Sequence, residues 1–66
     1  MDFIEILKEI MIELDLNQTT FANRVGVKQS QVSEWLKGKS KPSYDNIRLI
    51  CKNLDVSAQR ILGLED

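Results

Sequence analysis

Polar side chains that can pair with nucleic-acid bases recur at helical spacing between residues 29 and 37. In this stretch Val32, Trp35 and Leu36 follow an i, i+3, i+4 pattern, which places them on the inward face of a helix. The opposite face then carries amide, hydroxyl and carboxylate groups, which can exchange hydrogen bonds with base edges in the DNA major groove. We predict that the base-reading residues are Gln29, Ser30, Ser33 and Glu34. Any one of them could be an ordinary solvent-exposed residue, but the face as a group favours the functional interpretation.

Cationic and hydroxyl side chains on either side of that helix could hold DNA phosphates. Gln18 begins the preceding predicted helix, and the free backbone N–H groups at a helix N-terminus attract anions. After Gly38 the chain forms a short basic loop, which Pro42 stiffens. We predict phosphate contacts from Asn17, Gln18, Lys28, Lys37, Lys39, Lys41 and Ser43. The alternative interpretation of the lysines is a solvated loop without a ligand.

The net charge of −1 is compatible with a nucleic-acid partner because the charges are unevenly distributed. Residues 28–41 contain four lysines and one glutamate, a net charge of +3. Residues 1–15 contain five acids and one lysine, a net charge of −4. A local basic patch matters more for DNA binding than the overall charge does. We therefore expect a molecular dipole with its positive end toward DNA.

These candidate residues need a scaffold of short helices, and the sequence predicts five helices with no β-strand. Apolar residues recur at helical rather than alternating spacing. Helix starts are marked by the N-cap candidates Asn17, Ser43 and Ser57, and helix ends by Gly26, Gly38 and Gly63. The predicted ranges are 2–14, 18–25, 29–37, 44–54 and 58–62. The expected fold is a compact all-α domain in which the second and third helices form a helix-turn-helix.

Apolar stripes on the first and fourth predicted helices define the expected core. The stripe of the first helix is Phe3, Ile4, Leu7, Ile10, Met11 and Leu14. The stripe of the fourth is Ile47, Ile50, Cys51 and Leu54. We interpret Cys51 as a small buried apolar side chain rather than a reactive thiol. The hydrophobic fraction of 42% suffices for one core, so we assign residues 1–66 to a single domain.

Several function classes are disfavoured by what the sequence lacks. One cysteine and no histidine argue against a metal site, and we expect no cofactor. Without histidine there is no evident nucleophile–base pair, and no glycine-rich phosphate loop is present, so an enzyme is not expected. There is no apolar run that could span a bilayer and no signal-peptide pattern, which favours a cytoplasmic protein.

A spaced series of residues resembles the lambda-repressor/Cro family of helix-turn-helix DNA-binding domains, also called Xre-type. The series is Leu16, Asn17, Gln18, Ala22, Gly26, Val27, Val32, Trp35, Gly38, Lys39, Pro42 and Ser43. The resemblance extends over nearly the whole chain. It implies a five-helix lambda-repressor-like fold and a transcriptional regulator, most often a repressor that binds a two-fold operator as a homodimer through the third helix. It also strengthens the assignment of Gln18 as a phosphate contact.

Three departures from the family pattern lead to specific expectations. Lys28 replaces the serine or threonine that often caps the third helix, so we expect a poorly capped start there. Asp15 and Asp55 replace frequent glycines, which turn geometry tolerates. An arginine–glutamate pair of the family corresponds here to Met11 and Leu36, so we expect these two side chains to pack together in the core.

Two other functions on the same fold stay open. The chain could be an antitoxin-type regulator that binds DNA and a partner protein, or an interaction module that has lost DNA binding. For a homodimer on DNA, the candidates for the seam are Ile12, Ile61, Leu62 and Leu64. Some of the last three must close the core, and a lone exposed isoleucine is common.

Overall fold

Five helices follow one another along residues 2–64, the part of the chain that the computed structural model describes, and no strand occurs within it. They are α1 (Phe3–Glu13), α2 (Gln18–Val25), α3 (Gln29–Lys37), α4 (Tyr44–Leu54) and α5 (Ala58–Ile61). The all-helical fold class is confirmed, and α2, α3 and α4 have the predicted bounds. The predicted α1 was one residue too long at each end, and the predicted α5 one residue too long at its C-terminus.

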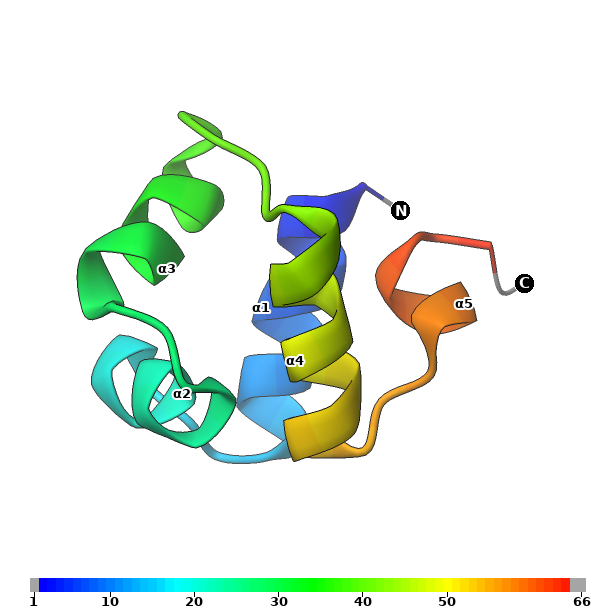
Figure 1. Cartoon of the computed structure of the whole chain (residues 1–66), viewed down its shortest axis with the longest axis horizontal. Coiled ribbons are helices and arrows are strands. Elements are labelled where there is room, and N and C mark those ends of the chain that lie inside the picture. Colours follow the sequence, from blue (N-terminus) through cyan, green and yellow to red (C-terminus); the bar gives the residue numbers. More distant parts are fainter. Residues whose placement is uncertain (1, 65–66) are drawn as a thin grey trace.

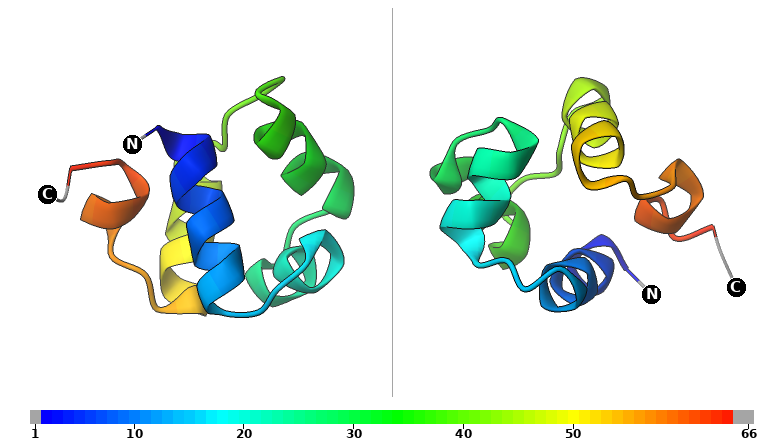
Figure 2. Two further views of the ribbon diagram at one scale, coloured as in Figure 1. Left: turned by 180° about the vertical axis from the view of Figure 1, so that it is seen from behind. Right: turned by 90° about the horizontal axis from the view of Figure 1, so that it is seen from below.

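The helices surround a single core with the helix-turn-helix at one end of the molecule. Figure 1 shows α2 and α3 at the left end and α5 at the right end. Helices α1 and α4 lie between these ends on opposite faces, as the view from below in Figure 2 makes plain. Contacts join α3 to α2 and α1, and they join α5 to α4 and α1. The two ends of the molecule are therefore held by the same central pair of helices.

Four of the five helices begin with a side-chain cap. In each, an oxygen of the N-cap side chain accepts a hydrogen bond from the backbone N–H three residues later, at 2.9–3.2 Å. The capping residues are Asp2, Asn17, Ser43 and Ser57. These bonds satisfy backbone donors that a helix leaves unpaired at its start. The exception is α3, which begins at Lys28.

All five helices end in the same way, with a residue in the left-handed backbone conformation. Those residues are Asp15, Gly26, Gly38, Asp55 and Gly63, with φ between 55° and 92°. The next residue then donates its N–H to the carbonyl five positions back, at 2.8–3.2 Å. This Schellman arrangement satisfies helix carbonyls and reverses the chain. The two aspartates take the glycine-like geometry, as expected from the sequence.

The core is formed by one buried stripe from each helix. Its members are Ile6, Leu7, Ile10, Met11, Phe21, Ala22, Val25, Val32, Trp35, Ile50, Leu54 and Ile61. No polar or charged side chain is buried among the described residues. The interior is therefore held by apolar packing, with polar contacts confined to its margins.

The sequence prediction of the core was wrong at Leu14 and Ile6, and several other predicted members are less enclosed than expected. Leu14 is 37% exposed, because α1 ends at Glu13 and the chain turns away there. Ile6, which was not assigned to the stripe, is only 5% exposed. Cys51 is half-buried rather than buried, as are Phe3, Ile4 and Ile47 of the predicted stripes. Met11 is buried and Leu36 is half-buried against the core, so Leu36 is less enclosed than expected, and their mutual contact stays a prediction.

Two side-chain contacts tie distant segments together at the surface of this core. The Asn53 side-chain amide donates a 2.8 Å hydrogen bond to the carbonyl of Val25, linking α4 to the C-terminal end of α2. Arg60 on α5 pairs with Glu13 at 2.5 Å and with Glu9 at 3.3 Å on α1. The hydrogen bond to Glu13 is the main reason why the pKa of Arg60 is raised. These solvent-exposed ion pairs link α5 to α1 and contribute little to stability.

The Asn53 contact can be tested with an isosteric change. Asn53→Asp removes the N–H donor and places a carboxylate against the Val25 carbonyl, so the free energy of unfolding should fall by about 1–2 kcal/mol. Urea denaturation followed by circular dichroism measures the change. The matched control is Asn23→Asp, which also adds a carboxylate to the last turn of a helix, where the position is exposed. Equal losses in the two variants would show that the added charge, not the hydrogen bond, is responsible.

Candidate nucleic-acid interface

A three-residue turn joins α2 to α3 and sets their relative direction. Gly26 has φ of 92°, a left-handed value that a side chain would strain. The N–H groups of Gly26 and Val27 both donate to the Ala22 carbonyl, at 2.8 and 3.0 Å. Ala22 and Val25 are buried beside the turn, which lets α3 pack closely on α2. The turn therefore fixes α3 at the edge of the molecule, where one of its faces meets solvent (Figure 1).

Helix α3 buries a narrow stripe and leaves a polar face exposed. Val32 and Trp35 are fully or nearly fully buried, and Leu36 packs half-buried beside them. The burial of Trp35 agrees with a core role and leaves its ring unavailable for stacking on bases. Of the predicted base-reading residues, Gln29, Ser30 and Glu34 are exposed, whereas Ser33 is half-buried. The first three thus share an accessible face, and Ser33 lies at its margin.

Both ends of α3 depart from the pattern of the other helices, and each departure introduces a lysine. At the start, Lys28 has no acceptor oxygen and makes no side-chain cap. The Gln31 side chain supplies only the reciprocal half of a capping box, accepting from the Lys28 N–H at 3.3 Å. At the end, Lys39 follows the left-handed Gly38, where the other four helices have an apolar residue. A helix that lacks a cap and gains cations at both ends is suited to an anionic ligand.

Asn17 and Ser43 each have a second hydrogen-bonding group beyond the one used in capping. Asn17 Oδ1 accepts from Thr20 N–H at 2.9 Å, which leaves the amide N–H₂ as a donor for an anion. Ser43 Oγ accepts from the Asn46 N–H at 3.2 Å, and its own hydroxyl hydrogen can still be donated. Both residues can therefore cap a helix and contact a phosphate at the same time.

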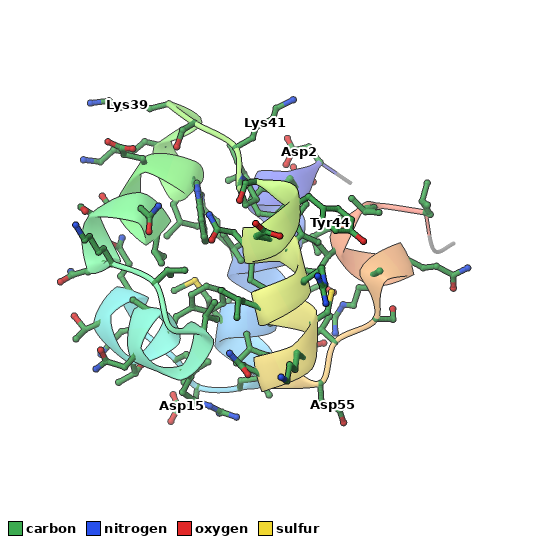
Figure 3. All side chains as sticks on the ribbon, in the orientation of Figure 1. Asp2, Asp15, Lys39, Lys41, Tyr44 and Asp55 are labelled. Atoms are coloured by element: carbon green, nitrogen blue, oxygen red, sulfur yellow. The ribbon has the colours of Figure 1, made fainter. Side chains whose placement is uncertain are left out.

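The remaining predicted phosphate contacts differ in accessibility. Lys28, Lys37, Lys39 and Lys41 are all exposed, whereas Gln18 is half-buried. Lys39 and Lys41 extend from the loop that follows α3, at the top of the molecule in Figure 3. Backbone N–H groups at the start of α2 add partial positive charge near Gln18. The four lysines thus lie at the two ends of α3 and in the loop that follows it.

The expected charge dipole is only partly present in the structure. Asp15 lies at the bottom of the view in Figure 3, whereas Lys39 and Lys41 lie at the top. Asp2, by contrast, lines the same surface pocket as Lys41, because the N-terminal end of α1 packs beside the loop after α3. One acid of the N-terminal segment is therefore drawn to the basic side, which weakens the local positive field there.

Sequence reasoning missed three residues that position this site. Thr20 completes a reciprocal box with Asn17, since Thr20 Oγ1 accepts from the Asn17 N–H at 2.9 Å. The N-x-x-T spacing could have indicated it, as could the K-x-x-Q spacing for Gln31. Asn53 lies 28 residues from its partner Val25, and no local signal points to that contact.

Comparison with known proteins identifies one family. A family model described as helix-turn-helix matches residues 7–61, which include all of α2–α5 and most of α1. Neither the curated proteins nor the solved structures gave a significant match. Among residues 2–64 there is no cluster of three or more potential metal ligands. No helix in that range is long and apolar enough to cross a membrane.

The missing cap of α3 leads to a stability prediction. Lys28→Ser supplies an oxygen that can accept from the Gln31 N–H, so the free energy of unfolding should rise by about 0.5–2 kcal/mol. The control is Lys41→Ser, in the exposed loop outside any helix, which should change stability by less than about 0.5 kcal/mol. Thermal or urea unfolding distinguishes the two. A Lys28→Ser protein no more stable than the wild type would contradict the cap assignment.

Proposed function

The chain belongs to the lambda-repressor/Cro-like (Xre-type) helix-turn-helix family of DNA-binding regulators, and from this membership we propose that it is a sequence-specific transcriptional repressor of a two-fold operator. The proposal rests on the exposed face of α3 and on the lysines at its two ends. This helix presents an exposed polar face. Lys28 stands where the other helices have a capping side chain, and Lys39 stands where they have an apolar residue. No other helix among residues 2–64 combines these features.

In this function, α3 enters the DNA major groove with its exposed face toward the base edges. Gln29 lies in the first turn, where helix-turn-helix proteins contact bases, and its amide can pair bidentately with adenine. Ser30 can donate to or accept from several bases. Glu34 either accepts a hydrogen bond from cytosine N4 or repels phosphate. Either effect limits the DNA sequences that the protein can bind. Ser33 lies at the margin of the face, and its short side chain reaches less far toward the base edges.

Phosphate contacts on both sides of α3 hold the helix in register. Lys39 and Lys41 contact one stretch of backbone together with the Ser43 hydroxyl. Asn17 and Gln18 contact another from the start of α2, and Lys28 and Lys37 lie between these groups. Such contacts position the protein without reading sequence. They account for binding to DNA of any sequence and for its dependence on salt.

A single copy of this domain offers few base contacts, which favours pairing on a two-fold operator. Two copies double the contacts and fix the spacing of the half-sites at about one DNA turn. Of the candidate seam residues, Ile61 is 1% exposed and serves the core. Leu62 and Leu64 are exposed at the α5 end, away from α3. Ile12 is also exposed, but no other large exposed hydrophobic residue accompanies it on α1.

The base-reading role can be tested on an operator selected from a random pool of oligonucleotides. Gln29→Ala should weaken binding to that operator by about 1–3 kcal/mol and relax the preference at one base pair per half-site. Folding should be intact, because Gln29 is exposed. The control is Gln59→Ala on α5, also exposed, which should leave affinity unchanged. Equal weakening on the operator and on random DNA would mean that Gln29 reads no base.

The phosphate-contacting role predicts a change in salt dependence. Lys39→Ala and Lys41→Ala should each weaken binding to operator and random DNA alike. Each should reduce the slope of log affinity against log salt concentration by about one. Lys8→Ala changes a lysine on α1 that is also exposed, so it serves as the control and should leave the slope unchanged. If the Lys39→Ala/Lys41→Ala protein kept the wild-type slope, these lysines would lie outside the interface.

A further inference from the structure

An open apolar groove lies between α4 and α5, at the end of the molecule away from α3. Its volume is about 720 Å³. Half-buried apolar side chains line it from α4, namely Ile47, Leu49 and Cys51. Ala58 and the 55% exposed Leu62 line it from the α5 side. Contiguous exposed apolar surface often marks an interaction site in a small protein.

The exposed charges that line this groove are mainly basic. Arg48 and Lys52 stand one turn apart on α4, and Asp45 is the single acid among the lining residues. The Arg48 guanidinium lies 6.0 Å from the centre of the Tyr44 ring. In a two-fold pair the same surface occurs on both copies, so direct groove-to-groove contact would bring basic side chains together. The groove therefore favours an occupant that is apolar and acidic.

The sequence after α5 combines an apolar residue with acidic ones, and its apolar residue Leu64 is exposed. After the left-handed residues of α1, α2 and α4, the apolar side chains Leu16, Val27 and Val56 pack against the core. Leu64 has the same backbone bond, N–H to the Gln59 carbonyl at 2.8 Å, yet its side chain is 69% exposed. In the sequence, Glu65 and Asp66 follow it directly.

The position of this segment points to a groove on another copy. In Figures 1 and 2 the chain after α5 lies on the side of α5 that faces away from α4. Leu64 is 69% exposed, so it does not fill the groove of its own chain. A second copy that approaches this end of the molecule meets the segment and the groove together, and the exposed face of α3 stays free on both copies.

We propose that two copies of this protein pair by exchanging the segments that follow α5. Leu64 of each copy packs into the α4–α5 groove of the other, and the acidic charges that follow Leu64 in the sequence complement the basic charges of Arg48 and Lys52. The exchange occurs twice about a two-fold axis, so every basic groove receives an acidic segment. This inference builds on the proposed two-fold operator, and it identifies the surface through which the second half-site is reached.

Charge reversal in two separate variants tests the exchange. The groove variant is Arg48→Glu/Lys52→Glu, and the tail variant is Glu65→Lys/Asp66→Lys. Each variant alone opposes like charges at both contacts, so its association constant should fall at least about tenfold below the wild type. An equimolar mixture matches opposite charges at both contacts, and heterodimers should form with wild-type affinity. Sedimentation equilibrium without DNA measures all three samples, with circular dichroism to confirm folding.

Two controls separate this exchange from other causes of association. Adding Leu64→Ser to both variants leaves their charges unchanged, so a mixture that still associates with wild-type affinity would reveal non-specific attraction and overturn the proposal. Combining all four charge changes in one chain should restore self-association. If that chain behaves like the wild type while the mixture stays monomeric, the segment occupies its own groove and the exchange is wrong. A wild type that is monomeric at millimolar concentration would also overturn it.

The outcome is independent of whether the protein binds DNA. Association is measured without DNA, and binding of each folded variant to a single half-site is measured separately. A groove variant that binds a half-site normally but loses affinity for the full operator supports both proposals. Normal pairing without any DNA binding would retain the exchange and reject the repressor function.

Discussion

The arrangement of this fold depends on the way each helix ends. A left-handed residue reverses the chain, and the next N–H returns to the carbonyl five residues earlier. The bond fixes the exit direction within two residues, so the following helix must begin close to the one before it. At Leu16, Val27 and Val56 the same geometry directs an apolar side chain onto the core. A chain of this length has little core to stabilise it, and these repeated reversals confine its helices to one packing.

Helix α3 shows what a binding surface requires of such a small domain. A helix that must present a polar face can bury only the opposite stripe, and here Val32 and Trp35 provide most of that burial. Lys28 gives up a cap, and Lys39 gives up an apolar contact. The remaining support is indirect, because Asn53 fixes the end of α2 against which α3 packs. The precision of the candidate interface thus rests on contacts outside α3.

Local signals in the sequence were sufficient to predict most of the helix limits. Caps such as Asn17 and Ser43, and glycines such as Gly26, act within four residues, so the bounds of α2, α3 and α4 can be derived from neighbouring residues alone. The exposed face of α3 also follows from its period. Three features could not be predicted in this way. They are the exposure of Leu14 together with the burial of Ile6, the half-burial of Ser33, and the Asn53 contact. Each depends on where another helix lies, and periodicity within one helix carries no information about that.

The exposed position of Lys39 has a consequence for how the protein can diverge. The motif that ends α3 is made by backbone atoms, with the Lys39 N–H bonded to the Glu34 carbonyl at 3.0 Å. Its side chain is exposed, so other residues at this position leave the hydrogen bond and the core intact. A mutation at position 39 can therefore change the attraction of the protein to a polyanion without producing a poorly folded variant. In this fold, affinity can drift along one evolutionary path while stability stays under separate selection.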